Sequence, residues 1–157
     1  MKLIRVTKGN FLFHLGKREK HLLTQVLRLY PRIPPATFRL SKSGKLPDGE
    51  ANQRLLDESL AEQREQNRKT LQAFLTDPRR FTDIESGSRL WLSPSELEWL
   101  LQILNDVRVG SWILLGSPDQ SMEVKLLNEK TAADFGAMEM SLQFQLRLLD
   151  ALEKREA

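Results

Sequence analysis

One segment of this chain opens with a full set of helix-start signals and then stays apolar on most sides. Ser93 occupies the N-cap position, Pro94 the first helical position, and Glu96 follows three residues after the cap, which is the pattern of a capping box. Gly116 ends the segment. The apolar positions are Leu97, Leu100, Leu101, Leu104, Val107, Trp112 and Leu115. Because a helix that is apolar around most of its circumference has to be covered, this segment predicts a central helix.

Three other segments carry the 3.6-residue spacing of helices. The first is Lys17–Tyr30, and the second is the longer Glu50–Leu75, for which Asp48 is a candidate cap. The last is Thr131–Lys154, whose apolar stripe is expected to pack on the central helix. The stripe consists of Phe135, Met138, Leu142, Leu146 and Leu149.

Strand signals are short and lie mainly at the N-terminus. Lys2–Thr7 and Asn10–Leu15 alternate in character and are separated by Lys8 and Gly9, which predicts a small β-hairpin, and Arg89–Leu92 can add a short strand. At 157 residues the chain has the usual length of one domain. We therefore expect a single, mainly α domain over residues 1–157, a bundle of about four helices with an N-terminal β-hairpin.

Prolines interrupt the connection between the first two helices, and the middle of the second helix is polar. Pro31, Pro34 and Pro35 begin a connection of about 19 residues in which no helix propagates far. The second helix has the polar middle AEQREQNRKT, which we expect to be solvated. Alternatively, Gln63 and Asn67 hydrogen-bond inside a helix–helix seam, where polar residues can fix register and oligomeric state.

The sequence shows no pattern of reactive residues that is typical of a catalytic or metal site. The chain has no cysteine, which excludes disulfides and thiolate chemistry and is typical of a reducing cytosol. His14 and His21 do not lie at metal-ligand spacing, and the sequence contains no glycine-rich phosphate loop or nucleophile elbow. No apolar run approaches the roughly 20 residues of a membrane span, and no signal peptide is recognisable. We expect a cytoplasmic protein without a catalytic centre, metal or cofactor.

Charge is divided unevenly along the chain. Residues 1–45 contain eleven Lys or Arg and one acidic residue, whereas the remainder is acidic, so that the net charge is only +3. The two parts can neutralise each other on the folded surface. Alternatively, Arg28, Arg32 and Arg39, interleaved with Tyr30 and Phe38, bind nucleic acid, because clustered cations gain affinity by releasing phosphate counterions and aromatic rings stack on bases.

The polar residues Asn105, Asp106 and Arg108 interrupt the apolar central helix. Helical spacing places Asn105, Arg108 and Trp112 on one face and Asp106 well around the cylinder, so we expect two different environments. A buried Arg108 requires a partner. A structural network within the chain or across a dimer is the simpler interpretation, and an anionic ligand held by Arg108 is the alternative.

The stretch EWLLQILNDVRVGSWILLG, residues 98–116, resembles the signature of a bacterial family of uncharacterised helical domains. In that family a WL pair precedes LND, an arginine and a leucine-glycine ending. LLTQVLRLYP at Leu22–Pro31 and the long arginine-rich second helix follow the same order. The resemblance implies a mostly helical fold and an emphasis on Asn105, Asp106 and Arg108. Members are often encoded near the adaptor of an ATP-dependent protease, which implies a regulatory partner.

These observations favour a non-enzymatic interaction or regulatory module. We expect it to form a homo-oligomer through the second or central helix, or to bind another protein. The alternative is a nucleic-acid-binding protein that uses the basic N-terminal third. An anionic-ligand binder built on Arg108 is the weakest of the three hypotheses.

Overall fold

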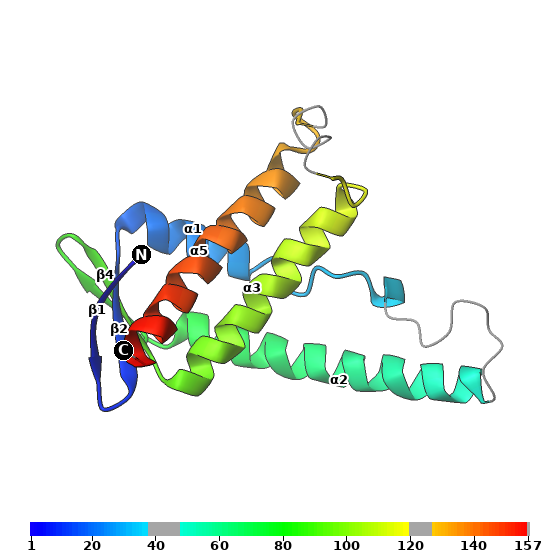
Figure 1. Ribbon diagram of the computed structural model, residues 1–157, viewed down its shortest axis with the longest axis horizontal. Helices are drawn as coiled ribbons and strands as arrows, with labels where there is room; N and C mark the ends of the chain where they lie inside the picture. The colour runs from blue at the N-terminus through cyan, green and yellow to red at the C-terminus, as the bar shows by residue number, and fades with distance from the viewer. Residues whose placement is uncertain (38–47, 120–126, 157) are drawn as a thin grey trace.

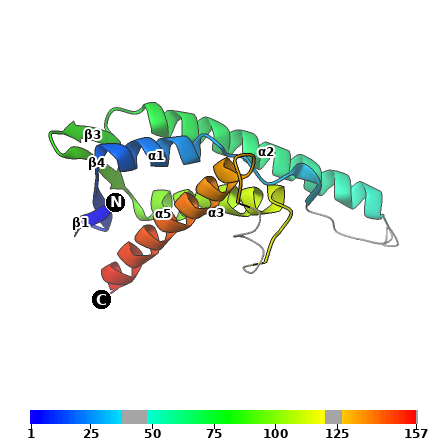
Figure 2. The same cartoon turned by 90° about the horizontal axis from the view of Figure 1, so that it is seen from above.

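The computed structural model describes residues 1–37, 48–119 and 127–156 and confirms a mainly α protein. Across these residues the helices are α1 (Lys17–Leu27), α2 (Gly49–Thr76), α3 (Pro94–Leu114) and α5 (Ala132–Glu156), with a 3-10 turn, η1, at Pro35–Thr37 (Figure 1). Helices α3 and α5 run side by side in opposite directions. A bundle describes this arrangement only loosely, because the N-terminal end of α2 extends beyond the other helices in both views (Figures 1 and 2).

The strands form one antiparallel sheet that is larger than the predicted hairpin. Strands β1 (Lys2–Thr7) and β2 (Asn10–Leu15) pair as predicted, and β2 also pairs with β4 (Gly87–Leu92), which contains the predicted strand at residues 89–92. Strand β3 (Phe81–Ile84) lies on the other side of β4, so the order is β1-β2-β4-β3. The sequence did not predict β3, because its four residues, FTDI, are few and do not alternate between apolar and polar.

The core lies between the sheet and helices α1, α3 and α5. Phe11, Phe13 and Leu15 of β2 are almost completely buried, as are Leu90 and Leu92 of β4. Helix α3 is central, as predicted, and its buried apolar residues are Leu97, Leu100, Ile103, Leu104 and Val107. The capping box is also confirmed: the Ser93 hydroxyl accepts the Glu96 N–H at 3.2 Å, and Glu96 accepts the Ser93 N–H at 2.8 Å.

The packing face of α5 differs from the predicted one. The predicted stripe is at best half-buried, with Leu146 50% and Leu149 45% exposed. The residues of α5 that are buried lie on a neighbouring face: Ala137, Ser141, Phe144, Leu148 and Ala151. Ala137, Ser141 and Ala151 are small, which allows neighbouring elements to approach α5 closely on this face, while Phe144 and Leu148 supply its apolar area.

Two predicted helix ends also need correction. Helix α1 ends at Leu27, with Arg28 as its C-cap, three residues before the predicted end. Tyr30 is unsuited to the helix because the residue before a proline is disfavoured in the helical conformation. Asp48 precedes α2 but makes no side-chain capping bond. Its φ of 55° is left-handed, so its carboxylate does not reach the N–H groups of the first turn.

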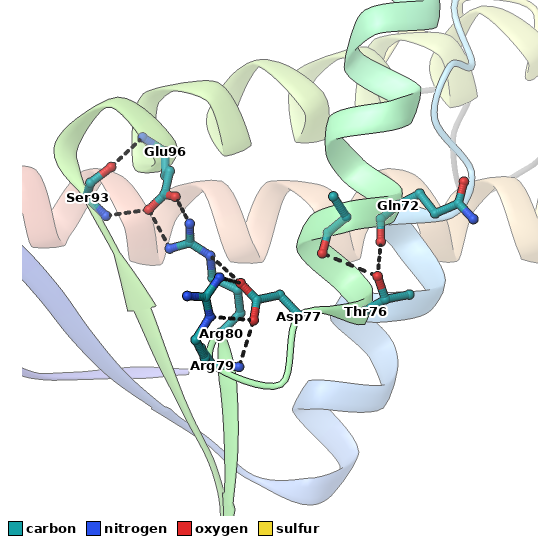
Figure 3. Close-up of polar contacts among 8 residues, drawn as sticks. Gln72, Thr76, Asp77, Arg79, Arg80, Ser93 and Glu96 are labelled. Carbon is teal, nitrogen blue, oxygen red and sulfur yellow. Dashed lines mark hydrogen bonds and ion pairs between the residues drawn. The ribbon is translucent and has the colours of Figure 1, made fainter.

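A charged cluster joins the end of α2 to the start of α3 (Figure 3). Arg80, just before β3, forms a two-pronged ion pair with Glu96 of the capping box. Asp77, at the end of α2, accepts hydrogen bonds from Arg79, which hold the pKa of the Asp77 carboxyl below its usual value. The cluster therefore uses its charges to fix the turn between two helices.

Candidate interaction surface

The segment that follows α1 is attached to α3 by Asp106. A carboxylate oxygen of Asp106 accepts the backbone N–H of Arg32 at 2.6 Å and that of Ile33 at 3.3 Å. The Arg32 side chain forms an ion pair with Asp134 of α5. Arg32 and Asp106, predicted for two different sites, thus belong to one structural network inside the chain.

Gly110 allows the same segment to lie directly against α3. A Cβ atom at this position would be 2.4 Å from the carbonyl carbon of Arg32 and 2.6 Å from the nitrogen of Ile33. Since both neighbours are backbone atoms, no side-chain rotation relieves the contact. Asp106 and Gly110, four residues apart on α3, together explain why the apolar helix is interrupted at this point.

Asn105 and Arg108 take no part in the contacts of Asp106 with residues 32 and 33, although Asn105 and Asp106 line the same cavity between α2 and α3. Arg108 donates to the Asn105 side-chain oxygen at 3.0 Å, and Asn105 is exposed. Trp112, on the same face, is 38% exposed and donates to the carbonyl of Pro118 at 2.9 Å. The Asn105–Arg108 pair is local to one helix turn, so it provides no network between distant elements.

Of the three basic candidates in the N-terminal third, the structure describes Arg28 and Arg32, which have different surroundings. Arg28 is exposed at the C-cap of α1, whereas Arg32 is committed to Asp134 and Asp106. Arg39 lies outside the described residues. The described chain therefore assigns only Arg28 of these three to the surface that the nucleic-acid hypothesis requires.

An open groove runs between the Pro31–Pro35 segment and α2, with a volume of about 660 Å³. We call it the proline groove. One wall consists of three prolines, Arg32 and Ile33, and the other combines Leu60 and Ala61 with four charged residues, so that most of the exposed surface inside the groove is apolar. The α2 residues that line it are Asp57, Leu60, Ala61, Arg64, Glu65 and Arg68. Because their spacing is three or four residues, they form one face of the helix.

The charged residues of the proline groove are only partly engaged within the chain. Arg64 donates to the backbone carbonyl of Ile33 at 2.8 Å, which uses one of its five N–H groups. Asp57 accepts from Gln53 at 2.9 Å, and Arg68 lies 3.7 Å from Glu65. Along α2, acidic Asp57 precedes the apolar pair Leu60 and Ala61. Arg64, Glu65 and Arg68 follow that pair.

Asn67 fixes α2 to the body of the protein. Its amide donates to the Tyr30 hydroxyl and its carbonyl accepts the Trp99 indole N–H, both at 3.1 Å. Burial raises the pKa of the Tyr30 hydroxyl, and the hydrogen bond from Asn67 opposes this shift. The alternative of a polar seam is thus observed for Asn67, whereas Gln63 is exposed.

Only the second half of α2 packs firmly. Its buried residues are Leu71 and Phe74, and the Phe74 ring lies 5.7 Å from that of Trp99. Before Asn67 every residue of α2 is exposed or half-buried, and Leu55 is 62% exposed. The first half of α2 is therefore a largely exposed helix that extends away from the sheet (Figure 1). We call it the free half of α2, and its residues Asp57, Leu60 and Ala61 line the proline groove.

The outward stripe of α5 is a second exposed apolar surface. We define the α5 outer stripe as Phe135, Met138, Leu142, Leu146 and Leu149. Exposed acidic residues flank it at Glu139, Asp150 and Glu153. Lys154 lies 2.7 Å from Asp150, and Arg155 is also exposed, so the charged residues around the stripe carry both signs.

The described residues hold no group of three or more His, Asp or Glu side chains that could bind a metal ion. His14 and Ser86 lie 3.1 Å apart in an exposed contact at the end of the sheet. None of the described helices is long and apolar enough to cross a membrane.

Both walls of the proline groove could be recognised in the sequence, but their proximity in space could not. The sequence marked the prolines as a helix break and α2 as a long helix. The two meet because Asp106 and Gly110 place residues 32 and 33 against α3, while Arg64 and Asn67 of α2 bond to Ile33 and Tyr30. Comparison with protein-family models, curated proteins and solved structures gave no match for this chain.

Proposed function

We propose that this chain is a non-enzymatic interaction module that associates with a second copy of itself through the proline groove and the free half of α2. One observation carries the proposal: α2 is held to the rest of the protein by Arg64, Asn67, Leu71 and Phe74, whereas its earlier turns are exposed or half-buried and border an open, largely apolar groove. Apolar walls of this kind gain free energy when a partner covers them.

The proline groove, rather than a difference in charge, favours α2 over the α5 outer stripe as the surface for self-association. The α5 rim carries both signs, because exposed Lys154 lies 2.7 Å from Asp150. The α2 face carries both Asp57 and the arginines Arg64 and Arg68. A surface with both signs can complement itself in a symmetric dimer.

A regulatory role in the cytoplasm is part of this proposal. The absence of cysteine is suited to a reducing compartment. The resemblance of residues 98–116 to a family encoded near a protease adaptor supports regulation.

Sedimentation equilibrium over micromolar to millimolar concentrations tests the proposal. The average mass should rise from the monomer value of 18.1 kDa toward that of a dimer as concentration increases. A mass that stays at 18.1 kDa throughout would overturn it. Leu146→Gln serves as a control, because it removes apolar surface from the α5 outer stripe and should leave the association unchanged.

A further inference from the structure

We infer that the two α2 helices of a dimer pair antiparallel about a two-fold axis that passes between Leu60 and Ala61. Asp57 of each copy then faces Arg64 of the partner subunit. This inference rests on the proposed self-association and specifies its geometry. The observation behind it is the order of side chains along the groove face: acidic Asp57, the apolar pair Leu60 and Ala61, then basic Arg64, with Glu65 and Arg68 beyond it.

The spacing of the groove residues is symmetric about the axis. Asp57 precedes Leu60 by three positions, and Arg64 follows Ala61 by three positions. In an antiparallel pair Leu60 therefore faces Ala61 of the partner subunit, and each Asp57 faces an arginine at the same height. One turn further out, Gln53 faces the partner's Arg68. Each facing pair occurs twice because the interface is isologous.

A parallel pair would place like charges opposite each other. Asp57 would meet Asp57 of the partner subunit, and Arg64 would meet the partner's Arg64. Like-charge contacts are unfavourable at such distances, so the charge order selects the antiparallel arrangement.

The chemistry of the groove suits this partner. Arg64 uses one N–H group for the carbonyl of Ile33 and keeps others for a carboxylate across the interface. Ala61 is small, so it allows the two helix axes to approach closely. The second α2 would also cover the walls formed by Ile33 and Pro34, which are open in a single chain.

The contact is short, so the dimer should be weak. The groove residues of α2 extend from Asp57 to Arg68, a length of about 17 Å at 1.5 Å per residue. A contact of about three helical turns buries much less surface area than a stable protein interface does. Association should accordingly require at least micromolar concentrations.

Charge reversal tests the facing pair. Asp57→Arg should weaken association about tenfold, because two attractive contacts become repulsive. Arg64→Asp should do the same. An equimolar mixture of the two variants should associate about as tightly as the natural chain, because each reversed residue then meets its complement. Failure of the mixture to recover would overturn the inference.

Glu62→Arg is the matched control for this experiment. It makes the same change in charge on α2, but helical spacing puts Glu62 on the side opposite the groove, where it is exposed. Association should remain within about twofold of the natural value. An equal loss in Glu62→Arg and Asp57→Arg would show that net charge alone controls association and would overturn the inference.

Cysteine cross-linking gives an independent readout. The chain has no cysteine, so Ala61→Cys introduces a single thiol close to the axis. Mild oxidation should convert this variant to a disulfide-linked dimer several times faster than Ser59→Cys, whose exposed side chain lies on the opposite side of α2. Equal rates for the two variants would contradict the inferred register.

The outcomes separate the inference from the function on which it rests. A strictly monomeric natural chain would overturn both. A chain that dimerises, but whose Asp57→Arg variant associates normally and whose Ala61→Cys variant does not cross-link, would overturn the inferred geometry alone. Loss of that dimer in Leu146→Gln would assign the interface to the α5 outer stripe.

Discussion

The carboxylate of Asp106 and the backbone nitrogen of Arg32 lie 2.6 Å apart, although 74 positions separate the two residues in the sequence. This contact places the Pro31–Pro35 segment over α3 and so positions one wall of the proline groove. The polar interruption of α3 is thereby explained by the need to hold an irregular segment whose N–H groups have no partner within a helix or strand.

Asp106→Ala should lower the free energy of unfolding by about 1–3 kcal/mol, because two half-buried backbone N–H groups lose their acceptor. Urea denaturation followed by circular dichroism measures the change. Asn105→Ala is the neighbouring control: Asn105 is exposed and bonds only one turn along its own helix, so its loss should cost less than about 0.5 kcal/mol. Equal costs for the two substitutions would be inconsistent with the anchoring role of Asp106.

Gly110→Ala and Gly136→Ala should change stability in opposite directions. Both residues lie within helices, where alanine is favoured over glycine by about 0.5–1 kcal/mol. A Cβ at Gly136 meets no atom within 4 Å, so this variant should be stabilised. A Cβ at Gly110 would lie 2.4 Å from backbone, so that variant should lose about 1–3 kcal/mol. Thermal unfolding of both variants provides the comparison, and a stabilised Gly110→Ala would refute the close approach.

Leu148→Ala and Leu146→Ala should identify the face of α5 that packs on the core. Leu148 is fully buried, and its truncation should cost about 2–5 kcal/mol. Leu146 is 50% exposed, and at protein concentrations that keep the chain monomeric its truncation should cost less than about 1 kcal/mol. Chemical denaturation distinguishes the two. A larger loss for Leu146 would mean that the stripe with the greater apolar area is the one that packs.

Tyr30 should titrate above the usual tyrosine pKa in the folded protein, since burial disfavours the charged phenolate. The fold then binds the neutral hydroxyl better than the phenolate, so the contribution of Tyr30 to stability is present below the ordinary pKa near 10 and falls as pH rises through the raised value. Tyr30 is the only tyrosine in the sequence, so ultraviolet absorbance reports it directly. The native curve should lie at higher pH than the curve in denaturant, and coincident curves would rule out the burial effect.

The sequence was sufficient to predict those helices and strands whose local signals agree with their packing. The capping box at Ser93 and the apolar character of α3 predicted that helix nearly to the residue, and the prediction of the second helix differed by one residue at each end. The hairpin of β1 and β2 also followed from local alternation. These elements depend mainly on residues that are neighbours in the chain.

Contacts between residues far apart in the sequence, and the choice of which helix face is buried, could not be predicted in the same way. Helix α5 has two apolar faces, and periodicity does not indicate that the face with Ala137 and Ala151 is the buried one. The candidate residues Arg32 and Asp106 were named for separate sites, because nothing local relates positions 74 residues apart. The proline groove depends on that same long-range contact, and so its existence could not be inferred from the sequence.

The position of β2 between β1 and β4 has a consequence for how the chain is made. When the first hairpin has been synthesised, one edge of β2 lacks its partner until residues 87–92 have followed. An unpaired strand edge beside the apolar side chains Phe11 and Phe13 is a template for aggregation. Fragments that stop before Gly87 should accumulate as insoluble material, whereas β4 completes the sheet and removes that hazard.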